Sequence, residues 1–191
     1  MSGDVTDNNA YGTVLESGAV RFERLLPGPI ERVWNYIVDP DKRATWLAGG
    51  KMDLRVGGRV ELFFRHNDLS DVKEMPPEKY RQYEGGVGGV SYITQIDPPR
   101  LLAMTWNEKE DSTGASANAS EVTFELTPKG DNVLLVLTHR RLASHDKMVS
   151  TASGWHTHLA IMVEHINGRA TPPFWSRHTR LEKEYDARLS A

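Results

Sequence analysis

Three histidines fall within ten residues in the segment SGWHTHLAIMVEHINGR, which spans 153–169. Histidine is a common metal ligand and a common acid or base near neutral pH. On a helix, His156 and His158 project to nearly opposite sides, whereas His158 and His165 share a face but lie about 10.5 Å apart along the axis. A zinc ion, whose bonds are about 2 Å long, cannot be held by such a pair. We therefore predict no metal site in this segment.

The same segment predicts a long helix over 153–168. Gly168 stands where a C-terminal cap belongs. The apolar side chains recur at helical spacing and form one broad face: Trp155, Leu159, Met162, Val163 and Ile166. The histidines therefore lie beside the apolar face of a helix.

The sequence carries no other pattern that requires catalysis. Its serines lack the G-x-S-x-G arrangement of a nucleophile elbow, and GGVGGV at 85–90 is followed by neither a Lys-Ser/Thr pair nor a helix. The carboxylates Glu108, Glu110 and Asp111 fall in a polar loop, where we expect solvent around them. His139 ends an apolar strand and is expected at a pocket mouth or on the surface. The sequence has no cysteine, which excludes disulfides, thiolate zinc sites and cysteine nucleophiles. Since no residue has a spacing that requires a catalytic role, we predict no catalytic residue, metal or cofactor.

The composition is that of one globular domain. The chain has 191 residues, of which 39% are hydrophobic and 26% charged, and this is enough for a single sizeable core. A net charge of −3 offers no basic surface for nucleic acid. No apolar run approaches the about 20 residues that a membrane span needs. Residues 1–18 lack the features of a signal peptide, so we expect a flexible N-terminal lead and a cytoplasmic protein.

Hydrophobic periodicity predicts an α+β domain over 19–169. An alternating strand at 19–26 precedes a helix that ends before Pro40 and a short second helix through 42–48. Residues 51–66 predict two strands across a tight Gly57-Gly58 turn, followed by a long mobile loop to Gly89. Four more strands complete an antiparallel meander, at 90–96, 101–106, 121–126 and 133–139.

Several motifs, in their order along the chain, resemble a known family. They are FERLLPGPIERVWNYIVDPDKRATWL, LRVGGRVELFF, IDPPRLLAMTW, VTFELTPKGDNVLLVLTH and SGWHTHLAIMVEHING. Together they resemble the Aha-type homologues of the heat-shock-protein-90 ATPase activator. That family belongs to the START-like, or SRPBCC, superfamily, which also includes polyketide cyclases and the Bet v allergens. The resemblance covers 19–169 and implies a helix-grip fold, in which a curved antiparallel sheet wraps around the long C-terminal helix and leaves a cavity.

Large flat or flexible side chains occupy the elements that would face this cavity. Aromatic residues and methionine line apolar ligand pockets because they offer area and adaptability, but they fill ordinary cores for the same reason. If the pairing of a strand were shifted by one residue, the side chains that face inward and those that face outward would change places. We predict the ligand-binding residues to be Trp46, Leu54, Tyr92, Met104, Trp106, Phe124, Trp155, His158, Leu159 and Met162.

The sequence departs from the family at two places. The pair of tryptophans often seen after the second helix is Trp46-Leu47 here, so we expect a different pocket entrance. Residues 170–191 add an amphipathic helix, predicted at 172–189, that Thr171 can cap. A helix this short is marginal alone in water, so we expect it to dock on its own domain or across a homodimer. The side chains on its apolar side are Phe174, His178, Leu181 and Tyr185.

Two classes of function fit these features. In the first, which we favour, the cavity binds a small apolar or amphipathic molecule, and the resemblance adds a stress-related role. In the second, a polyketide-cyclase-type enzyme acts on a bound aromatic or apolar substrate, and Tyr92 or His158 transfers a proton over about 3 Å. The resemblance also suggests a chaperone partner. In the eukaryotic relatives, however, that activity involves a further domain, which we expect this chain to lack.

Overall fold

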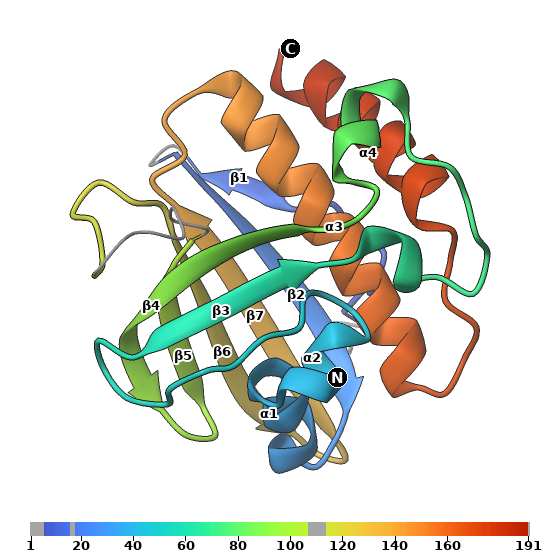
Figure 1. The fold of residues 1–191 in the computed structure, drawn as a ribbon. Helices are drawn as coiled ribbons and strands as arrows, with labels where there is room; N and C mark the ends of the chain where they lie inside the picture. Colours follow the sequence, from blue (N-terminus) through green and yellow to red (C-terminus); the bar gives the residue numbers. More distant parts are fainter. Residues whose placement is uncertain (1–5, 16–17, 107–113, 191) are drawn as a thin grey trace.

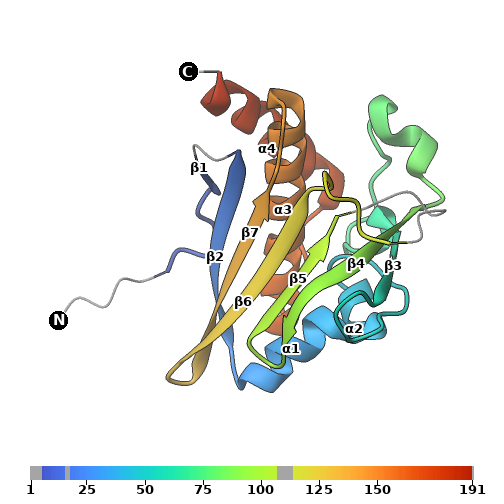
Figure 2. The ribbon, with the colours of Figure 1, turned by 90° about the vertical axis from the view of Figure 1, so that its left-hand side faces the viewer.

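A seven-stranded antiparallel sheet curves around one long helix (Figure 1). The computed structural model describes residues 6–15, 18–106 and 114–190. Within them the strand order is β1-β2-β7-β6-β5-β4-β3. Helices α3 and α4 lie on one side of the sheet, as the side view shows (Figure 2). The predicted α+β helix-grip architecture is confirmed.

The strands of the meander fall where the hydrophobic alternation predicts them. Their bounds are β2 Ala19–Pro27, β4 Val87–Asp97, β5 Leu101–Thr105, β6 Glu121–Lys129 and β7 Asn132–Arg140. In β2 the buried and half-buried positions alternate, with Val20, Phe22 and Leu26 on the inner side. This period of two places one set of side chains on the concave face, where α3 covers them.

The predicted hairpin at 51–66 forms only in part. Its second strand is β3, Arg59–Phe64, but residues before the turn make only isolated bridges, between Met52 and Val60 and between Gly49 and Phe63. The backbone of Gly58 lies very close to that of Asp53 in this turn, since a Cβ on Gly58 would be 1.9 Å from the carbonyl oxygen of Asp53. Only glycine fits there, so the turn was predicted correctly and its first strand was not.

Two short helices cover one end of the sheet. Helix α1 spans Ile30–Val38 and buries Val33, Trp34 and Ile37, as its spacing predicts. Helix α2 spans Pro40–Ala44, because the Asp39 carboxylate accepts hydrogen bonds from the backbone N–H groups of Asp41 and Lys42. This helix therefore begins and ends earlier than the predicted 42–48.

Helix α3 runs across the concave face of the sheet. It spans His145–Ile166 and so begins eight residues before the predicted start at 153. The Ser144 hydroxyl caps it by accepting a hydrogen bond from the backbone N–H of Lys147 at 3.3 Å. None of the helices in the described ranges is long and apolar enough to cross a membrane.

Helix α4 packs along α3 on its own domain (Figures 1 and 2). It spans Phe174–Leu189, and Phe174, Leu181 and Tyr185 are at most 3% exposed, as predicted for its apolar side. Thr171 does not cap this helix. Its hydroxyl instead donates to Asp71 at 3.3 Å and accepts a hydrogen bond from the Asp71 backbone N–H at 3.1 Å.

The N-terminal lead is tied to the sheet and to both long helices. Strand β1, Thr13–Leu15, pairs with β2, and the Asn8 side chain exchanges two hydrogen bonds with the backbone of Leu25, at 2.7 and 2.8 Å. The ring of Tyr11 meets that of His156 edge-on at 5.1 Å, and its hydroxyl donates to Glu184. Residues 6–15 are therefore fixed by contacts and do not form the flexible lead that the sequence predicts. The prediction was wrong here because most of the partners come from distant parts of the chain.

The segment predicted as a long loop contains two short 3-10 helices. These are η1, His66–Asp68, and η2, Glu78–Tyr83. The carboxylate of Glu74, which lies between them, accepts hydrogen bonds from the backbone N–H groups of Trp175 and Ser176 at 2.9 and 3.0 Å. A carboxylate at this position is stabilised by the dipole of α4. The segment is thus fixed against the start of α4.

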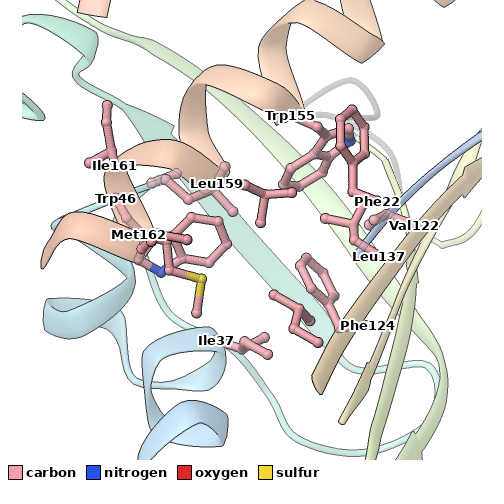
Figure 3. Packing of buried hydrophobic residues seen from close by; sticks show 14 of the residues in the cluster. Phe22, Ile37, Trp46, Val122, Phe124, Leu137, Trp155, Leu159, Ile161 and Met162 are labelled. Atoms are coloured by element: carbon pink, nitrogen blue, oxygen red, sulfur yellow. The ribbon is translucent and has the colours of Figure 1, made fainter. Parts of the chain in front are cut away.

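The core lies between α3, α1 and the sheet (Figure 3). Trp46, Phe124 and Leu159 are at most 1% exposed within it. The turn that carries Trp46 is held by Arg43, whose buried guanidinium donates to the carbonyl oxygens of Val38 and Ala48, each at 3.0 Å. Burial lowers the pKa of Arg43 to about 10, which is still well above neutral pH, so the guanidinium stays charged.

Candidate functional site

A cavity of about 340 Å³ lies between α3, α4 and the adjoining ends of β3, β4 and β5. Ligand pockets in proteins occupy roughly 300–1,000 Å³, so it has room for one small molecule. The lining residues are Leu47, Phe64, His66, Tyr80, Tyr83, Val87, Trp106, Ser150, Thr151, Gly154, Trp155, His158, Phe174, Trp175 and His178.

One end of the cavity is an aromatic wall built from β5 and α3. The rings of Trp106 and Trp155 lie 4.8 Å apart. The indole N–H of Trp155 donates to Nδ1 of His139 at 2.9 Å, and Nε2 of His139 is 2.9 Å from the hydroxyl of Ser120. Because Nδ1 accepts, the proton of this imidazole is on Nε2 and is donated to Ser120.

Burial keeps His139 neutral. This residue was expected at a pocket mouth or on the surface, but it is fully buried behind Trp155. Burial, with a smaller contribution from Arg141, lowers the pKa of His139 to about 3. A neutral imidazole can accept the Trp155 hydrogen bond, so the network fixes the orientation of the aromatic wall.

The other end of the cavity is a group of three histidines around Phe174, which we call the histidine cluster: His66, His158 and His178. The ring centres of His66 and His158 are 5.5 Å apart, and both pack on Phe174, at 4.8 and 5.2 Å. The ring of His178 stacks on the other side of the cluster, 5.9 Å from Phe174. Three chain segments, η1, α3 and α4, thus bring their imidazoles together.

All three histidines of the cluster are uncharged at neutral pH. Burial is the largest cause in each case: it lowers the pKa of His158 to about 3, that of His66 to about 4, and that of His178 below its ordinary value. Neighbouring imidazoles add to the effect at two of them, because His178 disfavours a charge on His66, and both disfavour a charge on His158.

The hydrogen bonds of the cluster are incomplete within the described part of the chain. Nδ1 of His158 donates to the carbonyl oxygen of Trp46 at 2.7 Å. Nδ1 of His66 and Nδ1 of His178 are both buried and have no hydrogen-bond partner among the described residues. Buried polar atoms in native proteins nearly always form a hydrogen bond, so these two Nδ1 atoms without a partner require an explanation.

A glycine keeps the cavity open on the α3 side. Gly154 lies in the middle of α3 and lines the cavity, and a Cβ added there would have no atom within 4 Å. A glycine inside a helix costs about 1 kcal/mol relative to alanine. The helix could therefore be more stable with a side chain at 154, and that side chain would project into free space.

Helix α4 and the segment at 66–83 close the remaining side. The indole N–H of Trp175 donates to Oδ1 of Asn67 at 2.5 Å, and the ring of Tyr80 stacks on that of Trp175 at 5.5 Å. The hydroxyl of Tyr80 donates to Glu182 at 2.7 Å. These contacts use the polar atoms of both aromatic residues, so their faces present apolar surface to the cavity.

The structure brings some of the predicted pocket residues to the cavity and leaves others in the core. Trp106, Trp155 and His158 line it. Leu54 is 47% exposed, because the segment before the Gly57-Gly58 turn forms no continuous strand that would turn it inward. The other six are buried and lie outside the lining formed by the described residues: Trp46, Tyr92, Met104, Phe124, Leu159 and Met162.

Sequence reasoning missed the residues that α4 and the segment after β3 contribute. Phe174 and His178 were predicted on the docking side of the last helix, but nothing in the sequence indicated that this side faces the cavity. His66 and Tyr80 fall in the stretch predicted as a loop, where periodicity gives no signal. The predicted solvated carboxylates Glu108, Glu110 and Asp111 lie outside the described residues.

Across the described ranges, no group of three or more His, Cys, Asp or Glu side chains could hold a metal ion. His156 points away from the cavity, toward Tyr11 and Tyr185, and its Nδ1 lies 3.0 Å from the Tyr185 hydroxyl. The opposite directions expected for His156 and His158 on a helix are thus observed.

A curved antiparallel sheet around a long helix, with a cavity between them, defines the helix-grip fold of START-like proteins. The chain belongs to the family described as activator of Hsp90 ATPase homolog 1-like protein, whose sequence model matches residues 27–167. The resemblance inferred from the sequence motifs is therefore confirmed. This family has a ligand-binding fold. A search of curated proteins finds no match to the chain.

Solved structures agree with this assignment. A protein from Bordetella parapertussis, determined by NMR in solution, is 42% identical with a TM-score of 0.76, over 97% of this chain and 95% of that one. CalU16 from Micromonospora echinospora is 21% identical with a TM-score of 0.62, over 95% and 96% of the two chains. DynU16 is 14% identical with a TM-score of 0.59, over 82% of this chain and 50% of its own. The last two comparisons concern the fold alone.

Proposed function

We propose that the protein binds a small, mainly aromatic or apolar molecule in the cavity between α3, α4 and the sheet. The observation that carries the proposal is Gly154, a glycine in the middle of a long helix whose missing side chain leaves open space beside Trp155 and His158. A sequence that only needed a filled core would gain helix stability and packing from a side chain here. Binding sites are where proteins depart from such local preferences.

The cavity walls suit a flat ligand. Trp106, Trp155 and Phe64 offer aromatic faces, and Phe174 and Trp175 close the opposite side. Aromatic rings contribute large contact areas and prefer offset or edge-on contacts with other rings. The cavity is amphipathic, because the histidine cluster makes one of its ends polar.

The second candidate function is a polyketide-cyclase-type enzyme. It is supported by DynU16, a relative in fold that is a protein of the dynemicin biosynthetic locus. A general base works best when its pKa lies near the working pH. Burial lowers the pKa of His158 to about 3, and Tyr92 does not belong to the lining formed by the described residues. A base this weak favours binding over proton transfer.

Filling the cavity tests the proposal directly. We expect the native protein to bind an apolar fluorescent probe, N-phenyl-1-naphthylamine, saturably and with one site per chain. The variant Gly154→Leu should weaken this binding at least tenfold, because its side chain occupies the free space. The matched control Gly154→Ala should retain most of the binding and raise the free energy of unfolding by about 0.5–1 kcal/mol.

Two results would contradict the proposal. One is the absence of saturable probe binding to a folded native protein. The other is unchanged affinity in a folded Gly154→Leu variant, which would place the probe elsewhere on the molecule. Circular dichroism on each variant establishes that the fold is kept.

The broader roles that the family suggests stay predictions. A stress-related role, a homodimer, a chaperone partner and a cytoplasmic location are separate from the cavity. A chaperone partner would contact the outer surface, so its ATPase activity should respond equally to the native protein and to Gly154→Leu. An effect that disappears with Gly154→Leu would tie the partner to the cavity and its ligand.

A further inference from the structure

The polar end of the cavity accepts and donates hydrogen bonds in a defined pattern. A neutral imidazole has one N–H and one lone pair. His158 uses its N–H, at Nδ1, for the carbonyl oxygen of Trp46 at 2.7 Å. Its Nε2 therefore carries a lone pair, and no hydrogen bond to it is formed by any of the described residues. The ring lines the cavity, so a group that meets Nε2 there has to donate.

The neighbouring imidazoles add the complementary capacity. His66 and His178 are also neutral, so each carries one N–H and one lone pair. Nδ1 is fully buried in both rings, so a ligand in the cavity meets these imidazoles at Nε2. Two other polar groups of the walls are already used, since Tyr80 donates to Glu182 and Trp155 donates to His139. The histidine cluster is thus the place where the polar part of a ligand would be bound.

Charged head groups do not match this end of the cavity. Its lining, as far as the structure describes it, contains no arginine, lysine, aspartate or glutamate. A carboxylate would face the lone pair of His158 without a cation nearby, and an ammonium group would be buried without a carboxylate. Both arrangements carry a large desolvation cost. An ether or ketone would also fail, since it cannot donate to Nε2.

We propose that the ligand is a hydroxylated aromatic or enolic molecule whose neutral hydroxyl donates to Nε2 of His158 and accepts from a second histidine of the cluster, His66 or His178. A hydroxyl is the simplest group that both donates and accepts, and its flat ring would lie between Phe64, Phe174 and the two tryptophans Trp106 and Trp155. This inference rests on the proposed binding function and specifies its ligand class.

A matched set of probes separates the inference from the function on which it rests. Binding of naphthalene, 2-naphthol, 2-methoxynaphthalene and 2-naphthoate is measured by isothermal titration calorimetry at pH 7. The four share one ring system and differ in the head group. We expect 2-naphthol to bind about tenfold more tightly than 2-methoxynaphthalene, the usual effect of leaving one buried hydrogen-bonding group unpaired, and 2-naphthoate to bind most weakly.

A variant then assigns the preference to His158. His158→Phe keeps an aromatic ring against Phe174 but has no acceptor, so the ratio of the 2-naphthol and 2-methoxynaphthalene affinities should fall to about one. The control His165→Phe makes the same change two turns further along α3, outside the cavity lining, and should leave the ratio unchanged. If His158→Phe does not fold, the probe series on the native protein decides alone.

Each failure has its own pattern. Equal affinity of the native protein for naphthalene, 2-methoxynaphthalene and 2-naphthol would overturn the inference and leave the cavity as an apolar binding site. Tightest binding of 2-naphthoate would overturn it as well, since it would make the cluster an anion site. Absence of binding for all four probes, together with absence of N-phenyl-1-naphthylamine binding, would remove the proposed function itself.

Discussion

Mild acid should destabilise this protein well before its carboxylates titrate. Burial lowers the pKa of four histidines far enough to keep them neutral in the folded protein at pH 5: that of His66 to about 4 and those of His139, His156 and His158 to about 3. In the unfolded chain each would take up a proton near pH 6.5. Lowering the pH from 7 to 5 is therefore the perturbation.

The sign and size follow from the difference in pKa. A histidine whose pKa is depressed in the folded state contributes fully to stability above about pH 6.5. It loses that contribution as the pH falls from 6.5 toward the folded value of about 3 to 4. At pH 5 each such histidine lowers the free energy of unfolding by about 2 kcal/mol. Four together amount to about 8 kcal/mol, against a typical total stability of about 5–15 kcal/mol.

Thermal and urea unfolding at pH 7, 6 and 5, followed by circular dichroism, measure this effect. The slope of stability against pH should approach about 1.4 kcal/mol per unit for each buried histidine. His158→Phe should reduce the slope by one such increment. Phe174→Leu alters the same cavity without a titratable group, so it should lower stability at pH 7 and keep the slope.

The reasoning is refuted if the native protein loses less than about 1 kcal/mol between pH 7 and pH 5. Such a result would mean that the histidines are protonated in the folded state, at pKa values near those of a free chain. The histidine cluster would then be neutral only near pH 7 and above, and the preference for 2-naphthol would have to disappear at pH 5.

Two further predictions concern the walls of the cavity. Trp106→Ala should cost clearly less free energy of unfolding than Phe124→Ala. Phe124 is 1% exposed in the filled core, where truncation costs about 3–5 kcal/mol, whereas Trp106 has free space on one side. Urea unfolding of the two variants measures the difference. Equal losses of stability would make Trp106 an ordinary core residue. Truncation after Arg169 removes α4, so it should lower the melting temperature and abolish probe binding. A truncated protein that melts and binds like the native one would show that α4 does not form the wall.

The strands and α1 could be predicted from the sequence because their patterns are local. Val20, Phe22 and Leu26 alternate with polar residues, and one face of a strand is buried as a result. In α1 the spacing of Val33 and Ile37 marks the buried side of a helix. Both periods follow from backbone geometry alone, so tertiary contacts reinforce the local preference without changing it.

The start of α3 and the first strand of the hairpin could not be predicted in the same way. Only Met148, Val149 and Ala152 of residues 145–152 are buried, so the apolar face is sparse there and the start of the helix is marked mainly by the capping Ser144. The turn at Gly58 depends on its approach to the carbonyl oxygen of Asp53, a contact that has no periodic signature. That unformed strand is also the reason why Leu54 is exposed.

The candidate site was accessible to sequence reasoning only where it lies on predicted elements. Trp106 and Trp155 belong to a strand and a helix whose inner faces were expected, and both line the cavity. His66, Phe174 and His178 enter it because α4 docks on α3 and the chain after β3 folds back. Docking of this kind depends on complementary surfaces far apart in the chain, which a single sequence does not reveal.

The order of the strands also bears on how the protein is made. Strand β2, at 19–27, pairs on one side with β1 and on the other with β7, at 132–140, and α3 follows β7. During synthesis, the apolar side chains of Val20, Phe22 and Leu26 therefore lack their partners in β7 and α3 until more than 100 further residues have been made. Sheets dominated by such distant pairings fold slowly and expose apolar surface in the interval. The joining of β1 and β2 to the rest of the sheet is thus a late event, which requires β7 and the helix α3 that follows it.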